Sequence, residues 1–139
     1  MTSKDLLFTK ADDIATQAYP EWGIETEALQ GTWNNVNMLT GQISRIEIIL
    51  SEDKLTLNCF GKLETGEMEW GFVNGDIFSS KVTSKVIEAF WAEYDFGFME
   101  TKIVANIKYG VMVIQAFNTF KDGSDRNNYF SREFFVIKR

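Results

Sequence analysis

Alternating apolar and polar residues fill most of the chain after residue 30, in short stretches separated by turn-forming residues. The pattern is clearest where Met68, Trp70 and Phe72 alternate with two glutamates and a glycine. Stretches of this kind span 31–37, 43–50, 54–61, 67–73, 98–108, 111–120 and 129–137. An apolar residue at every second position predicts β-strands that each bury one face.

The connections between these stretches contain residues that are typical of tight turns. Asn74-Gly75-Asp76 is the strongest turn signal in the chain, because Asn-Gly readily adopts the positive φ of a hairpin turn. We therefore expect a strand to end before residue 74 and a new one to begin after residue 76.

The segment 77–94 is compatible with two assignments. Its apolar residues recur at helical spacing, and Ser84 is a suitable cap for such a helix. Its aromatic residues, Phe90 and Trp91 among them, instead favour a strand. We favour the strand, and a helix near 84–94 within an α+β fold is the alternative.

These stretches predict an all-β protein with about eight consecutive strands joined by short turns, the pattern of an antiparallel up-and-down sheet. An open sheet of that size would leave two unpaired edges, which invite association with other chains. Closure into a barrel removes both edges, and about eight strands leave an interior just wide enough for side chains or one small ligand. We expect this barrel to comprise residues 29–139.

Residues 1–28 differ from the rest of the chain and are expected to form an N-terminal helical extension. Thr9 can cap a short helix that Pro20 ends, with two aspartates in its first turn, where the helix dipole favours them. Because a helix this short is not stable alone, its apolar face around Ile14 is expected to dock on another surface.

The composition excludes several functional classes. The chain has no histidine, which removes Ser-His-Asp and Cys-His catalysis as well as histidine-ligated metals. The one cysteine, Cys59, has no partner for an internal disulfide, and with carboxylates alone it makes a poor zinc site. The net charge is −6 and the basic residues are scattered, which disfavours nucleic acid as a partner. We expect neither a metal nor a cofactor.

The sequence also bears on where the protein resides. It has no run of about 18 apolar residues, the length that a membrane-spanning helix needs. Residues 1–10 are too polar for a secretory signal, and a single cysteine fits a reducing compartment. The expectation is a cytoplasmic protein that does not associate with membranes.

A motif at the start of the first predicted strand resembles that of a known superfamily. The sequence Leu-Gln-Gly-Thr-Trp-Asn-Asn at residues 29–35 is similar to the opening of the calycins, which include lipocalins, fatty-acid-binding proteins and avidins. In those families the tryptophan of a Gly-x-Trp closes one end of the barrel, and a basic residue of the last strand packs across its indole. The resemblance implies these roles for Gly31 and Trp33, with Arg132 or Arg139 as the basic residue. Such a stack contributes roughly 0.5–2 kcal/mol.

Within the calycins the chain is most similar to the avidins, in length, in short loops and in its Gly-Thr-Trp-x-Asn sequence. Fatty-acid-binding proteins place two helices between the first two strands, where this chain has only residues 38–42. The pattern by which avidins hold biotin does not map onto these strands. The chain also resembles small uncharacterised bacterial domains that open on Gly-Thr-Trp and close on Tyr-Phe-x-Arg-Glu, here residues 129–133. The resemblance therefore implies a fold and no particular ligand.

Polar residues lie on both faces of several predicted strands, so two assignments of the barrel interior are open. In the first, which we favour, the interior is a packed apolar core of Ile46, Ile48, Leu50, Leu55 and Leu57. In the second, polar and aromatic residues together line a ligand pocket, as is typical of small-molecule sites. The candidate ligand-binding residues are then Arg45, Asn58, Trp70, Thr119, Tyr129 and Glu133. Arg45 and Glu133 would have to pair if both were buried, because an unpaired buried charge is very costly.

Three functions are compatible with these features. The first is a non-enzymatic barrel that binds a small, partly apolar molecule, and the second is a structural or interaction module with a filled barrel. The third is an enzyme such as an isomerase or cyclase that works by shape and carboxylates. Without histidine or a paired-carboxylate motif, catalysis is disfavoured and no catalytic residue is assigned.

The aromatic residues between Trp70 and Phe98 bear on assembly. Strand alternation forces some of them outward, and an exposed apolar patch usually marks an interface. A two-fold homodimer on this face is the expected assembly. The alternatives are a tetramer, as is common among avidins, or a monomer whose patch is covered by the N-terminal helix.

Overall fold

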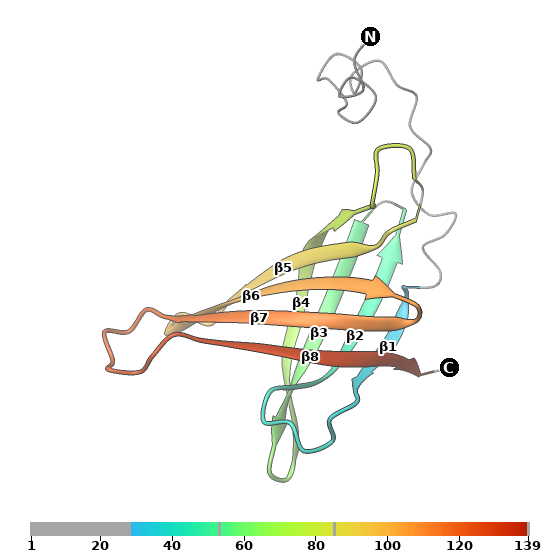
Figure 1. Cartoon of the computed structure of the whole chain (residues 1–139). Helices are drawn as coiled ribbons and strands as arrows, with labels where there is room; N and C mark the ends of the chain where they lie inside the picture. The colour runs from blue at the N-terminus through green and yellow to red at the C-terminus, as the bar shows by residue number, and fades with distance from the viewer. Residues whose placement is uncertain (1–28, 53, 85, 139) are drawn as a thin grey trace, which may run out of the picture.

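A computed structural model describes residues 29–52, 54–84 and 86–138, and shows a closed barrel of eight antiparallel strands in sequence order (Figure 1). The strands are β1 (Gly31–Asn35), β2 (Ile43–Ser51), β3 (Lys54–Leu63), β4 (Gly66–Phe78), β5 (Ala89–Asp95), β6 (Met99–Lys108), β7 (Val111–Phe120) and β8 (Tyr129–Lys138). The last strand pairs with the first, which closes the sheet. The predicted all-β up-and-down barrel is therefore confirmed, whereas the predicted helix within residues 1–28 lies outside the described residues.

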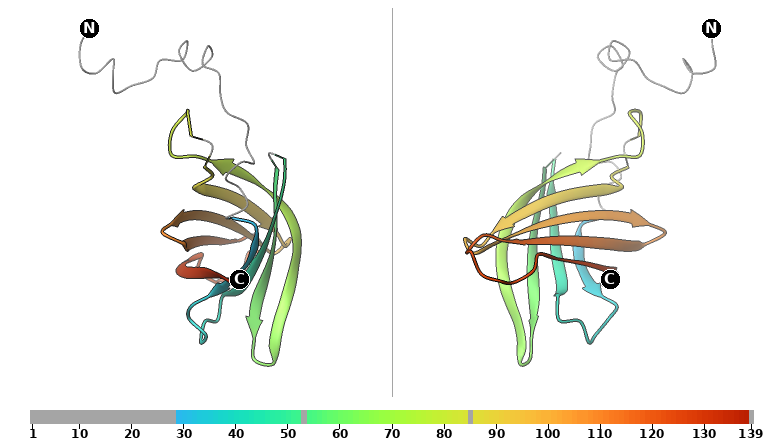
Figure 2. Two further views of the ribbon diagram at one scale, coloured as in Figure 1. Left: turned by 90° about the vertical axis from the view of Figure 1, so that its right-hand side faces the viewer. Right: turned by 60° about the vertical axis from the view of Figure 1, so that its left-hand side comes forward.

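Because neighbouring strands run antiparallel, the connections alternate between the two ends of the barrel (Figures 1 and 2). The β1–β2, β3–β4, β5–β6 and β7–β8 connections lie at one end, which we call the mouth. The other end, which we call the base, holds the remaining connections, the start of β1 and the end of β8. No helix within the described ranges is long and apolar enough to cross a membrane.

The interior is a packed apolar core over most of its length. Ile46, Ile48, Leu55 and Leu57 point inward and are fully buried, which confirms the first of the two assignments for these strands. Leu29 and Ile87, which flank the strands at the base, are buried in the same core. The base is therefore closed by apolar side chains from the chain before β1 and from the β4–β5 loop.

Trp33 lies inside the barrel near this base. Its side chain is 1% exposed, and its Nε1 donates a hydrogen bond to the Leu29 carbonyl oxygen at 2.8 Å. Gly31 precedes it at a φ of +141°, where a Cβ would lie 2.9 Å from Cδ1 of Ile137. The absence of a side chain at Gly31 thus lets the first strand lie close against the last.

Arg132 does not stack on Trp33. It is exposed on the outer face of β8, opposite Gln115 of β7, because its neighbours Ser131 and Glu133 take the inward positions. Among the described residues no cationic group lies over the Trp33 indole. The role that the resemblance implied for Arg132 is therefore wrong, and Arg139 lies outside the described residues.

The predicted turn at Asn74-Gly75-Asp76 is also wrong, because these residues lie inside β4. Gly75 pairs with Leu55 of β3 on one side and with Ala92 of β5 on the other. A Cβ at this position would lie 2.8 Å from Cδ2 of Leu55 and 3.1 Å from the Trp91 carbonyl oxygen. A glycine at this position therefore favours close packing between the strands and does not form a turn.

The ambiguous segment 77–94 contains no helix in its described part. Residues Ala89–Asp95 form β5, which confirms the strand assignment for the aromatic residues and contradicts the helical alternative near 84–94. Its first two residues complete β4, and the β4–β5 loop lies between the two strands. Phe90 is fully buried, so pairing and burial decided the conformation of this segment.

Candidate functional site

A cavity of about 150 Å³ opens at the mouth of the barrel. One part of its lining comes from the β1–β2 loop, β2, β3 and β4, and the other part comes from β6, β7 and β8. The side chains and glycines that line it are Gly41, Gln42, Ile43, Gly61, Lys62, Leu63, Met68, Trp70, Met99, Ala116, Asn118, Tyr129 and Ser131. The lining is therefore mainly apolar with a few hydrogen-bonding groups, as expected of a small-molecule site.

Polar groups inside the barrel next to this cavity are satisfied by one another. Thr101 and Asn118 face each other across β6 and β7 and are both buried. The Thr101 hydroxyl donates to Oδ1 of Asn118 at 2.6 Å, and Nδ2 of Asn118 donates a long bond of 3.4 Å to the Tyr129 carbonyl oxygen. The first bond fixes the orientation of the Asn118 amide.

Trp70 is held against the cavity by an aromatic cluster. Its ring meets Tyr94 edge-on with 5.3 Å between centroids, and it meets Phe96 in the same way at 5.2 Å. Tyr94 and Phe96 are stacked at 5.5 Å. On the other side Gly61 provides room, because a Cβ there would lie 2.8 Å from Nε1 of Trp70. These contacts restrict the indole to one orientation.

A β-bulge places Trp70 on the inner face. Between Asn58 and Phe60 the register with β4 shifts by one residue, and Gly71 adopts a φ of +96° that favours glycine. The shift leaves two backbone groups without partners in the ladder, and the Tyr94 hydroxyl binds both of them. It accepts from the Cys59 N–H at 3.0 Å and donates to the Gly71 carbonyl oxygen at 2.6 Å. Burial raises the pKa of Tyr94, so the hydroxyl stays protonated and can donate.

The rim of the mouth is held in place by Glu133. Its carboxylate points inward from β8 and accepts hydrogen bonds from the Thr40 hydroxyl at 2.6 Å and from Nδ2 of Asn37 at 3.3 Å. Both donors belong to the β1–β2 loop, whose residues Gly41 and Gln42 line the cavity. Glu133 therefore positions one side of the entrance.

The structure brings together only part of the predicted ligand-binding set. Trp70 and Tyr129 line the cavity, and Glu133 lies at its rim on the same face of β8. Arg45 and Thr119 lie on the outer face, and Asn58 bonds to residues of the neighbouring strand β4. The predicted pairing of Arg45 with Glu133 does not occur, because the two side chains lie on opposite faces of the sheet.

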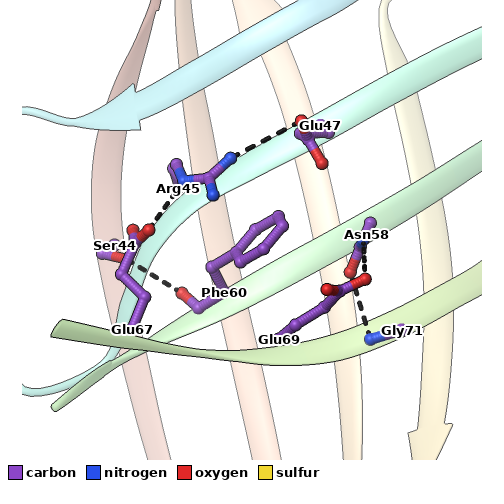
Figure 3. Close-up of polar contacts among 8 residues, drawn as sticks. All are labelled: Ser44, Arg45, Glu47, Asn58, Phe60, Glu67, Glu69 and Gly71. Carbon is purple, nitrogen blue, oxygen red and sulfur yellow. Dashed lines mark hydrogen bonds and ion pairs between the residues drawn. The ribbon is translucent and has the colours of Figure 1, made fainter.

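Arg45 is part of a polar network on the outer face of β2, β3 and β4 (Figure 3). Its guanidinium lies 3.6 Å from the centre of the Phe60 ring, and its Nε donates to Oε1 of Glu67 at 2.8 Å. Glu47 lies 3.5 Å from the same guanidinium. Although burial opposes it, hydrogen bonds from Ser44 and Arg45 hold the pKa of Glu67 below its ordinary value. This network covers Phe60 and ties three strands together.

Asn58 stabilises the bulge and does not face the cavity. It is 1% exposed; its Nδ2 donates to Glu69 at 2.7 Å, and its Oδ1 accepts from the Gly71 N–H at 3.1 Å (Figure 3). The side chain thus replaces ladder bonds that the register shift removes. Thr119 lines a separate outer groove with Glu93, Glu100, Lys102 and Phe117.

Sequence reasoning missed Asn118, Met68 and Met99 as lining residues. On β7 it chose the face of Thr119, because both faces of that strand carry apolar residues and alternation alone does not say which is inward. Asn118 becomes recognisable only from its pairing with Tyr129, which faces inward on β8. Within the described ranges no group of three or more cysteine, aspartate or glutamate side chains is placed to hold a metal ion.

Cys59 is fully buried on β3, and burial raises the pKa of its thiol to about 12. Because the thiolate is the reactive form, we expect Ellman's reagent not to label the native protein at mildly alkaline pH. The same protein in guanidinium chloride should be labelled at one thiol per chain. Rapid stoichiometric labelling of the native protein would show that β3 opens readily and contradict this expectation.

Comparisons of the chain with protein families, with curated proteins and with solved structures found no match.

Proposed function

We propose that the barrel binds a small, partly apolar molecule in the mouth cavity and is not an enzyme. The observation that carries the proposal is the cavity of about 150 Å³ at the mouth, next to the buried apolar core of the barrel. An apolar cavity of about 150 Å³ is large enough for a benzene-sized molecule. The proposed ligand is accordingly a single ring or a short branched chain, much smaller than a fatty acid.

The lining supports a ligand with one apolar and one polar end. Trp70, Met68 and Met99 provide polarisable apolar surface, to which aromatic rings and thioethers bind well. Ser131 and Asn118 provide hydroxyl and amide groups from two adjacent inward positions on β8 and β7. A phenol-like molecule, with its ring against Trp70 and its hydroxyl toward Ser131, matches this distribution.

A calycin relationship is part of the same proposal. The Gly31-Thr32-Trp33 opening at the base of an eight-stranded up-and-down barrel supports it, and so does the pairing of the first strand with the last. The chain differs in the basic residue, since Arg132 faces outward. A catalytic role is disfavoured, because Glu133, the carboxylate at the rim, already accepts two hydrogen bonds from the β1–β2 loop.

The test uses 4-fluorophenol as a probe and follows its fluorine NMR line. We expect the line to broaden in the presence of the protein, and we expect excess phenol to reverse the effect. Ser131→Leu should abolish the broadening, because the larger side chain occupies the cavity. Thr119→Leu is the matched control, a similar change on the outer face of the adjacent strand, and should behave as wild type.

Equal broadening by wild type and Ser131→Leu would place the probe elsewhere and overturn the assignment of the site. No broadening by any variant would contradict the phenol-like ligand class. Mass spectrometry of the purified wild-type protein under native conditions should in addition detect a bound molecule that Ser131→Leu lacks.

A further inference from the structure

The outer face of β7 and β8 is an exposed apolar surface, which we call the β7–β8 face. Its outward residues are Val111, Val113, Gln115, Phe117 and Thr119 of β7, with Phe130, Arg132, Phe134, Val136 and Lys138 of β8. Phe130, Phe134 and Phe117 are 53%, 47% and 44% exposed. The ring centroids of Phe117 and Phe130 lie 5.3 Å apart. Figure 1 views the barrel with these two strands in front. An apolar face of this kind usually has a partner.

The charges on this face are all positive. None of its ten outward residues carries a carboxylate, whereas Arg132 and Lys138 are cationic. Neither takes part in an ion pair within the described ranges. The outer face of β2 to β4 carries Glu47, Glu67 and Glu69 and so has the opposite character. A complementary partner is therefore apolar and acidic.

Residues 1–28 have this chemistry. They contain six carboxylates and two lysines, a net side-chain charge of −4 within a chain of net −6. They also contain Phe8, Ile14 and Trp22 among their apolar residues. We propose that residues 1–28 dock on the β7–β8 face of the same chain and cover its phenylalanines.

The position where this segment joins the barrel supports docking within one chain. Thr32 of β1 pairs with Lys138 of β8, so residue 29 lies at the base beside the cationic end of the face. The ten residues of β8 extend about 33 Å, and a fully extended segment of this length would reach about 90–100 Å. The segment can therefore reach every part of the face without strain.

A second copy of the chain is the competing occupant, and charge disfavours it. A two-fold dimer pairs the same patch with itself, which brings Arg132 and Lys138 toward like charges. The region first predicted for a homodimer offers less surface than its aromatic content suggested. Phe90 is in the core and Trp70 packs against the core, which leaves Phe72, Phe78 and Phe98 exposed.

The test is limited proteolysis of the full-length protein with a glutamate-specific protease, followed by intact-mass analysis. Cleavage at glutamates 21, 25 and 27 reports whether the segment is accessible. Phe130→Ser combined with Phe134→Ser should accelerate this cleavage by about tenfold or more, because the rate follows the population of the undocked form. Phe72→Ser, a change at a similarly exposed phenylalanine on β4, is the matched control and should cleave as wild type.

A second variant tests the electrostatic part independently of the phenylalanines. Arg132→Glu should also accelerate cleavage within residues 1–28, and high salt should accelerate cleavage of the wild type. Light scattering should give a monomer of 16 kDa. Equally fast cleavage of the wild type and all variants would overturn the proposal. So would a wild-type dimer that dissociates in the Phe130/Phe134 variant, since the face would then bind a second copy.

Discussion

Replacement of Trp33 by alanine is expected to lower the free energy of unfolding by about 3–5 kcal/mol, the usual cost of removing a large buried aromatic side chain. The indole is 1% exposed and lies where the first strand meets the closed base of the barrel. Its loss leaves a cavity and also removes the hydrogen bond to the Leu29 carbonyl oxygen. Typical domains have only about 5–15 kcal/mol in total, so the substitution should remove a large share of the stability of the fold.

Denaturant unfolding followed by far-UV circular dichroism measures this change. Trp33→Phe retains most of the packing and loses the Nε1 bond, so its loss of stability should be clearly smaller. Phe72→Ala, at a residue that is 54% exposed, should change the unfolding free energy by less than about 1 kcal/mol. A Trp33→Ala midpoint close to that of Phe72→Ala would contradict a stabilising role for the indole.

Replacement of Tyr94 by phenylalanine should cost about 2–3 kcal/mol, although it removes a single oxygen atom. The hydroxyl binds the Cys59 N–H and the Gly71 carbonyl oxygen, which the bulge in β4 leaves without ladder partners. Without it, both backbone groups remain buried or part-buried and unsatisfied. We expect the bulge to loosen and the Trp70 ring, which packs on Tyr94, to lose its fixed orientation.

The control for this change is Tyr129→Phe, because the Tyr129 hydroxyl makes no hydrogen bond within the described part of the chain and the residue is partly exposed. Its unfolding free energy should be near that of wild type. Near-UV circular dichroism should report the change at Trp70 in Tyr94→Phe alone. If the two variants have equal stability, the Tyr94 hydroxyl does not hold the bulge.

Local pattern was enough to identify most of the strands and the filled part of the interior. The period of two on β2 and β3 identified Ile46, Ile48, Leu55 and Leu57 as inward residues, because burial of one face imposes that period whatever the neighbours are. On β8 the same period places Tyr129 and Glu133 on one face. The number of strands and the short turns between them indicated closure, since an open sheet would leave its edges unpaired.

Tertiary structure decided those features that depend on contacts between neighbouring strands. Asn74 and Gly75 have the local preference of a turn, but pairing with β3 and β5 places both of them inside β4, where a Cβ at Gly75 would crowd Leu55 and the Trp91 carbonyl oxygen. The bulge at Gly71 is likewise set by pairing with β3 and by the Tyr94 hydroxyl from β5, which lies 23 residues away in the sequence.

The candidate site was only half predictable for the same reason. Trp70 and Tyr129 were predicted correctly, because each is an aromatic residue in a stretch of alternating apolar and polar positions. Arg45 and Thr119 were assigned to the wrong face. On β7 both faces are apolar, so the choice between Asn118 and Thr119 depends on the register with β8 and not on β7 itself. The sequence alone indicated that a barrel forms and which residues of β2 and β3 point into its core. The pairing of strands distant in sequence determined where its mouth remains open, because a cavity depends on side chains from several strands at once.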